Sequence, residues 1–104
     1  MMGLEENKED EEIKNDIKWF ILSKMTRHRF WVHKHTSIHN LPKGLPDYLR
    51  SRKEVRKVID NLLKDGTLMS KPTSYGLEVS LNIKKKAQIE GFIEERRKKF
   101  EKSN

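Results

Sequence analysis

The strongest structural signal in this chain is a short amphipathic segment with clear start and stop residues. The spacing of one helix face, i, i+3, i+4, i+7 and i+8, is occupied by Val55, Val58, Ile59, Leu62 and Leu63. An S-x-x-E sequence at residues 51–54 precedes this stripe and is typical of a capping box. Gly66 follows the stripe, and glycine readily adopts the left-handed conformation that ends helices. The sequence therefore predicts a helix over about residues 52–65.

The apolar period changes to two directly after this helix. In the run Leu77–Ile83 apolar residues alternate with polar ones, and a shorter run at residues 67–71 precedes it. The sequence Pro-Thr-Ser-Tyr-Gly separates the two runs and has the composition of a turn. We therefore expect a β-hairpin with one face on the core and the other in water.

The N-terminal third of the chain contains another amphipathic pattern. Its stripe consists of Ile13, Ile17, Phe20 and Ile21 and predicts a helix over about residues 12–26. Trp19 and Leu22 lie off this stripe, so the later turns have apolar side chains on two sides. Another element must cover the second side.

The C-terminal segment, residues 84–100, is the expected last helix, with Asn82 as its cap. Arg96 interrupts its apolar stripe, and so narrow a stripe buries little by itself. It either packs on the first helix within one chain or meets a second copy of the chain. We expect a homodimer, whose contacts would be Trp19, Leu22, Ile89, Phe92, Ile93 and Phe100.

The middle of the chain combines an extended piece with short turns. The segment Phe30–Thr36 is rich in aromatic and β-branched residues and reads as a short strand. In the following "NLPKGLPDYL", Pro42 and Pro46 exclude a long helix. They favour one or two short turns, the second beginning with Pro46 at its first position.

Composition limits the chain to one domain with a modest core. It has 104 residues, of which 34% are hydrophobic and 38% charged. Without cysteine it has neither disulfides nor cysteine-ligated zinc. The N-terminus has no apolar stretch, and no apolar run approaches the roughly 20 residues that cross a bilayer. We therefore expect no membrane insertion and a cytoplasmic location.

The net charge of +7 is unevenly distributed. Residues 1–12 contain six acids and one lysine, so this segment carries −5 and the rest of the chain +12. We expect residues 1–12 to be a disordered acidic tail and residues 101–104 to be a second short tail. The excess of positive charge indicates a polyanionic partner, although a solvated lysine-rich surface is the alternative.

The expected order of elements is helix, strand, short helix, turn, capped helix and hairpin. This order, with "NLLKDGTLMSK" and "YGLEVSLNI" as its most specific parts, resembles the winged helix-turn-helix superfamily, especially small prokaryotic and archaeal regulators. The resemblance implies an α+β fold over residues 13–83, with a three-helix core and a β-hairpin wing. Residues 84–100 would add a C-terminal helix for packing or dimerisation. The two prolines of "HNLPKGLPDYL" depart from the family, in which most members have a plain second helix.

The resemblance implies that the third helix lies in the major groove of DNA. The face opposite its apolar stripe is mostly cationic, and arginine, lysine and asparagine side chains can read base edges. Asp60 interrupts this face, and it would accept from a cytosine or pair with Arg56 or Lys64. The expected recognition residues are Lys53, Arg56, Lys57, Asn61 and Lys64.

Phosphate contacts are expected at two places. Arg50, Ser51 and Arg52 precede the capped helix, whose N-terminus favours an anion. The wing would add Lys71, Thr73 and Ser74, because hydroxyl and ammonium groups fix position on the backbone. The neighbouring Tyr75 either joins these donors or packs on the core.

Every histidine of the chain lies within residues 28–39. Zinc needs three or four converging ligands, whereas only His33 and His35 share a strand face, and no carboxylate lies between Arg27 and Asn40. Neither a catalytic triad nor a phosphate loop is present, so we expect no metal, no cofactor and no enzymatic activity. We expect His33, Lys34 and His35 to flank the DNA-facing surface instead.

The sequence therefore predicts a protein that binds double-stranded DNA sequence-specifically and regulates transcription. A winged-helix module for protein–protein interaction is one alternative. A basic protein that associates with RNA or the ribosome is another. Fold resemblance does not separate these functions.

Overall fold

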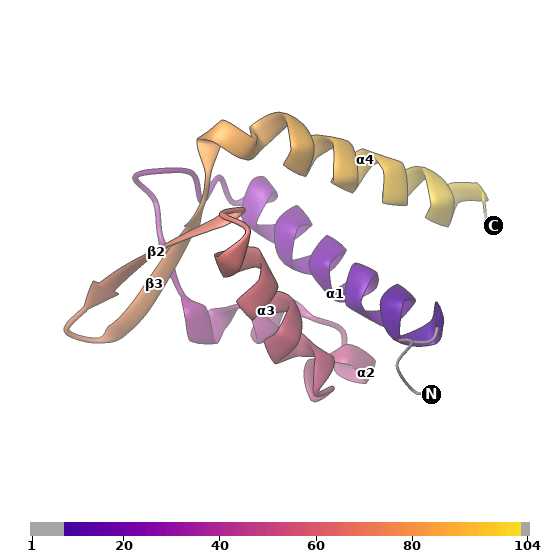
Figure 1. Ribbon diagram of the computed structural model, residues 1–104, viewed down its shortest axis with the longest axis horizontal. Coiled ribbons are helices and arrows are strands. Elements are labelled where there is room, and N and C mark those ends of the chain that lie inside the picture. Colours follow the sequence, from indigo (N-terminus) through magenta and orange to yellow (C-terminus); the bar gives the residue numbers. More distant parts are fainter. Residues whose placement is uncertain (1–7, 103–104) are drawn as a thin grey trace.

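The computed structural model describes residues 8–102 and has an α+β fold (Figure 1). In chain order its elements are α1 (Lys8–Arg27), β1 (Thr36–Ser37), the 3-10 helices η1 (Ile38–Asn40) and η2 (Pro42–Gly44), α2 (Asp47–Arg50), α3 (Glu54–Lys64), β2 (Leu68–Thr73), β3 (Gly76–Leu81), the 3-10 helix η3 (Ile83–Lys85) and α4 (Lys86–Lys102).

Helix α1 is the central element of the fold. It contacts both α3 and α4, and in Figure 1 it runs between them. Its buried residues Ile17, Leu22 and Met25 lie in one core cluster with residues of α3 and the sheet. The hairpin of β2 and β3 projects from this body.

The apolar stripe predicted for residues 55–63 is confirmed. Val55, Val58, Ile59 and Leu62 are buried, and Leu63 packs partly buried against the same cluster. Gly66 has φ +81°, so it ends the helix in the left-handed region as expected.

The predicted capping box at the start of α3 is wrong. Ser51 ends α2, and no side chain caps α3, which begins only at Glu54. The cause is the tight turn between the two helices, where Arg52 N–H donates to Leu49 O and Val55 N–H donates to Arg52 O. This turn directs Glu54, which is only 5% exposed, back toward Arg52.

The predicted hairpin is confirmed, and β3 is the central strand of a three-stranded antiparallel sheet ordered β1-β3-β2. A two-residue turn joins β2 to β3, and Gly76 beside it has φ +120°. The expected alternation fails at Ser80, which is 3% exposed although it was placed on the wet face. Val79, Ser80 and Leu81 are all buried, so the base of β3 is covered on both faces.

The predicted strand at residues 30–36 is wrong except at its last residue. Only Thr36–Ser37 forms β1, together with an isolated bridge from Trp31 to Leu81. Arg29 and Val32 have φ of 60° and 45°, and such values interrupt an extended chain. The segment between α1 and β1 is therefore a sequence of turns.

Both ends of the helical structure extend further than predicted. Residues 8–12, expected in the disordered tail, form the first turns of α1, where Glu9, Asp10 and Glu11 are favoured by the helix dipole. Helix α4 likewise continues to Lys102. The remaining parts of the predicted tails, residues 1–7 and 103–104, lie outside the described residues.

The short turns and the last cap agree with the sequence. Pro42 is the first residue of η2, and Pro46 lies one residue before α2 rather than at its first position. The Asn82 side chain accepts a hydrogen bond from the N–H of Lys84, 3.0 Å away, and so caps η3, which leads into α4.

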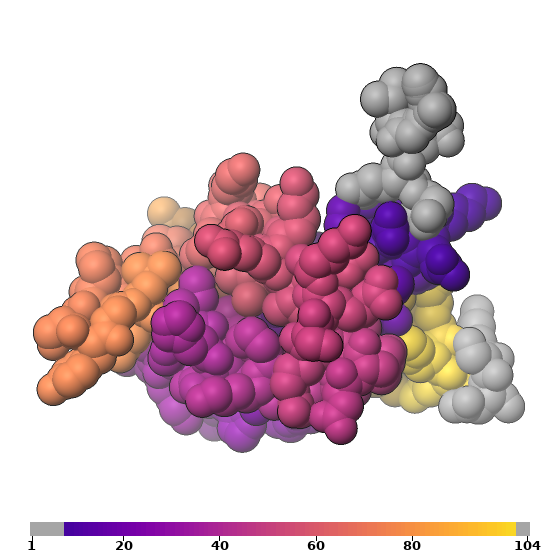
Figure 2. Space-filling view, turned by 90° about the horizontal axis from the view of Figure 1, so that it is seen from below, coloured from indigo at the N-terminus to yellow at the C-terminus, as the bar shows by residue number. Residues whose placement is uncertain are grey.

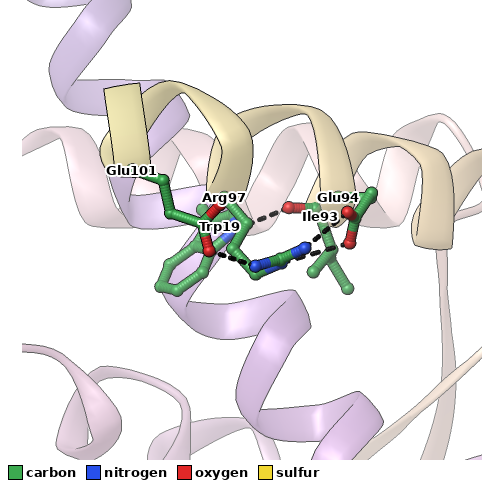
Figure 3. Close-up of polar contacts among 5 residues, drawn as sticks. All are labelled: Trp19, Ile93, Glu94, Arg97 and Glu101. Atoms are coloured by element: carbon green, nitrogen blue, oxygen red, sulfur yellow. Dashed lines mark hydrogen bonds and ion pairs between the residues drawn. The ribbon is translucent and has the colours of Figure 1, made fainter. Parts of the chain in front are cut away.

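The second apolar side of α1 and the apolar stripe of α4 pack against each other within one chain. The Trp19 Nε1–H donates to Ile93 O at 3.0 Å, as Figure 3 shows, and the Trp19 ring lies 5.3 Å from that of Phe100. Leu22 and Ile89 are 1% and 2% exposed. These contacts are intramolecular, so the homodimer stays a prediction and would need other surfaces.

Arg96, which interrupts the stripe of α4, is a buried ion-pair partner of α1. Its Nη2 lies 2.9 Å from Glu12 Oε1 and 2.7 Å from Asp16 Oδ1. The hydrogen bond from Arg96 is the main reason that the pKa of Glu12 lies below its ordinary value of 4.5. By contrast Arg97, the next residue, is exposed and pairs with Glu94 and Glu101 of its own helix (Figure 3).

We expect Arg96→Met to lower the free energy of unfolding by about 1–2 kcal/mol, because it leaves Asp16 and Glu12 unpaired between two helices. The loss is below that for fully buried pairs, since the Glu12 side chain is 55% exposed. Arg97→Met is the matched control and should change stability little. Chemical denaturation of both variants and the unmodified chain measures the difference.

The same pair predicts a pH dependence. A carboxylate with a lowered pKa stabilises the fold above its unfolded-state pKa, and this contribution is lost as the pH falls through the folded-state pKa. The stability difference between the unmodified chain and Arg96→Met should therefore be full at pH 6 to 7 and shrink below about pH 4.5. A difference independent of pH from 3 to 7 would contradict the assignment of this ion pair.

Candidate nucleic-acid interface

The side chains predicted to read DNA lie together on the outward face of α3. Because the apolar stripe holds α3 against the core, the opposite face is directed into solvent, on the side of the molecule that Figure 2 shows. All five are exposed. We call this set the cationic face of α3: Lys53, Arg56, Lys57, Asn61 and Lys64.

Carboxylates of Asp10 and Glu54 lie near the cationic face, where they line a hollow with Lys53 and Lys57. Among residues 8–102, the lysines of this face and Arg56 form no salt bridge within 4 Å. Asp60 lies in the same row and is exposed, but it forms no ion pair with Arg56 or Lys64 in the described chain, contrary to one of the two expectations for it. The positive charges therefore face solvent.

A broad hollow of about 680 Å³ lies between α3 and the segment before α2. Ile38, His39 and Pro42 line one side, whereas Val55 and Ile59 contribute apolar surface from α3. Four cationic side chains, one serine and one acid complete the lining: Arg50, Arg52, Lys53, Arg56, Ser51 and Asp60. This hollow joins the predicted phosphate residues to the first turns of α3.

His39 belongs to this hollow, although the sequence analysis did not include it. The Ser37 hydroxyl accepts a hydrogen bond from the His39 N–H at 3.2 Å and so begins η1. The local sequence signal for this cap is Ser37, which lies two residues before His39 and next to a proline-containing turn.

The side chains of Arg50 and Arg52 already form hydrogen bonds and ion pairs within the protein. Arg50 donates to Leu45 O at 3.0 Å and pairs with Asp47 at 3.2 Å. Arg52 donates to both carboxylate oxygens of Glu54 at 3.0 and 3.3 Å. Ser51 is exposed between them. Phosphate binding by these three residues stays a prediction.

Glu54 changes the electrostatics at the N-terminus of α3. The hydrogen bond from Arg52, followed by that from its own backbone N–H, holds the pKa of the Glu54 carboxyl below its ordinary value. A carboxylate therefore already lies where the sequence analysis expected the helix dipole to favour a phosphate. Phosphate contacts near this end must come from the lysine and arginine side chains themselves.

A second groove, of about 350 Å³, lies between α1 and α3. Lys57 and Asn61 line it from α3, and Lys14 and Lys18 line it from α1. These two lysines of α1 are not among the site residues predicted from the sequence. Their spacing at i, i+4 on the first helix was the signal, but only the packing of α1 beside α3 brings them to this side.

The acidic first turn of α1 approaches the N-terminus of α3. Asp10, Lys53 and Lys57 line the same small hollow of about 280 Å³. The Glu54 hydrogen bond is the main reason that the pKa of Arg52 is raised, and the charges of Asp10 and Glu9 contribute further. Acidic and basic groups of distant segments are thus adjacent here.

The hairpin presents a tyrosine at its tip. Tyr75 is 95% exposed, so the alternative that it packs on the core is wrong. Ser74 is exposed beside it, whereas the Thr73 hydroxyl donates to Gly76 O at 2.8 Å and accepts from the Tyr75 N–H, and so holds the turn. Lys71 is exposed and pairs in register with Glu78 of β3.

The histidine segment lies elsewhere. The Lys34 Nζ donates to His28 O at 2.9 Å, and the bridge from Trp31 holds this loop beside Leu81, at the end of α1 remote from the first turn of α3 (Figure 1). The structure therefore does not bring His33, Lys34 and His35 to the start of the cationic face. Within residues 8–102 no group of three or more acidic or histidine side chains is placed to hold a metal ion.

Comparison with known proteins provides no further identification. No protein-family model matches the chain, and neither a curated protein nor a solved structure matches it. In the described part of the chain, no helix has the length and apolar character needed to cross a bilayer.

Proposed function

We propose that this chain is a winged helix-turn-helix protein that binds double-stranded DNA sequence-specifically, with α3 in the major groove, and regulates transcription. Helix α2 is followed by a tight turn, α3 and a projecting hairpin, which is the order that this architecture requires. The hairpin would be the wing, with Tyr75 at its tip.

The observation that carries the proposal is that the basic side chains of the cationic face of α3 form no ion pair within residues 8–102. Charges needed for folding are paired here, as at Arg96 and Arg52. Lys53, Lys57 and Arg56 instead face solvent on a convex helix, where arginine and lysine reach phosphates or guanine edges.

Lys57 tests base recognition. We expect Lys57→Gln to relax the preference at one base position by about 1–3 kcal/mol, because one polar contact to a base edge is lost. Lys98→Gln on α4 is the control, since it removes the same charge from an exposed position outside the described grooves. Selection of bound oligonucleotides from a random pool measures the preference. Equal effects of the two substitutions would contradict a role for Lys57 in reading bases.

Salt dependence tests the phosphate contacts. If about six phosphates are bound, the logarithm of the affinity should fall against the logarithm of salt concentration with a slope near −5. Titrations with duplex DNA, with duplex RNA of the same sequence and with an acidic protein distinguish the functions. Preference for the RNA would favour the alternative RNA-associated role, and absence of nucleic-acid binding would favour the protein-interaction role.

The acidic first turn of α1 should weaken DNA binding, because Glu9 and Asp10 lie near the start of the cationic face. We expect Glu9→Gln combined with Asp10→Asn to tighten binding about two- to fivefold at low salt, with less effect at high salt. The control combines Glu90→Gln with Glu95→Gln on α4 and has the same net charge. An equal gain in the control would show that only net charge matters.

A further inference from the structure

A cavity outside the proposed DNA surface has the chemistry of a small-molecule site. It lies between the C-terminal half of α1 and the segment that contains β1, η1 and η2, and its volume is about 360 Å³. No residue of α3 lines it. This volume is within the range of small-ligand pockets, at its lower end.

The floor of the cavity is apolar. Phe20, Ile21 and Met25 line it from α1, while Phe30 and Leu41 line it from the opposite side. Ile21, Met25 and Leu41 belong to the buried core, whereas the two phenylalanines are only partly buried and remain accessible from the cavity. An apolar body of about eight carbons would gain contacts with this floor.

The mouth of the cavity is cationic and contains no carboxylate. Lys24, His28 and Lys43 are its ionisable lining residues, and Thr36 and Asn40 supply further polar groups. Neither lysine forms a salt bridge within the described chain. Two unpaired ammonium groups above an apolar floor favour an anion over a neutral or cationic ligand.

Gly44 places one of these ammonium groups. A Cβ atom at residue 44 would lie 2.6 Å from Lys24 Cδ and 2.9 Å from Lys24 Nζ. The Lys24 side chain therefore reaches from α1 to the backbone of η2, directly beside Lys43. The absence of a side chain at Gly44 allows this arrangement.

We propose that this cavity binds a small carboxylate with an apolar body, with the carboxylate at Lys24 and Lys43 and the apolar part against Phe20, Phe30 and Leu41. The cavity shares no lining residue with the cationic face of α3, so this proposal does not depend on the proposed DNA contacts. It is therefore tested on the free protein.

The test uses octanoate, with 1-octanol and octylammonium as probes that have the same total number of carbon atoms. We expect octanoate to bind with a Kd below about 1 mM. Both other probes should bind about tenfold more weakly, because they lack one charge-assisted contact with a lysine. Calorimetry measures the affinities, and amide chemical shifts in NMR spectra locate the site. Shift changes should centre on the cavity residues of α1 and on residues 36–43.

Variants test the charge directly. Lys43→Gln, at an exposed position, should weaken octanoate binding severalfold, and adding Lys24→Gln should remove the preference over 1-octanol. The double substitution Lys84→Gln and Lys98→Gln has the same net charge and should change nothing. The proposal is overturned if octanoate does not bind at about 5 mM, if 1-octanol binds as tightly, if the shifts lie elsewhere, or if the control variant loses as much affinity.

Discussion

The burial of α1 on several sides is the constraint on which the rest of the structure depends. Its buried residues form one core with residues of α3 and the sheet. The contacts of Trp19 and Arg96 hold α4 against another side of α1. In a chain with so little apolar material, the single core is centred on this helix, which contacts α3, α4, η2 and β3. The direction in which α3 presents its charges follows from this packing.

The charged residues divide into two groups with different physical roles. Arg96 and Arg52 lie against carboxylates that are themselves partly or fully buried, so their charges stabilise contacts between elements. The lysines of α3 and the pair Lys24 and Lys43 form no salt bridge within residues 8–102. Unpaired charges that cluster on a surface are available to ligands, and the two proposals concern two such clusters.

The accuracy of the sequence analysis varied with the distance over which each signal acts. The stripe of α3 and the hairpin were predicted correctly, because side chains three, four or two positions apart determine these elements. The capping box was wrong although its motif is complete, because the turn from α2 directs Glu54 to Arg52. The path of the loop that carries His33 and His35 also could not be predicted, because Arg29 and Val32 adopt positive φ values that no local pattern indicates.

The sequence by itself determined the outward charge of α3, because the same periodicity that buries its valines and leucines directs Lys57 away from them. Only the tertiary structure decided which partners the side chains of Arg96 and Trp19 contact. Arg96 lies 80 positions from Asp16, and Trp19 lies 74 positions from Ile93, so no local pattern joins them. The same holds for the cavity, since Lys24 and Lys43 line it together only because η2 packs on α1. Contacts between distant segments depend on the simultaneous packing of all elements. The spacing of apolar residues within one segment does not specify which other segment packs against it.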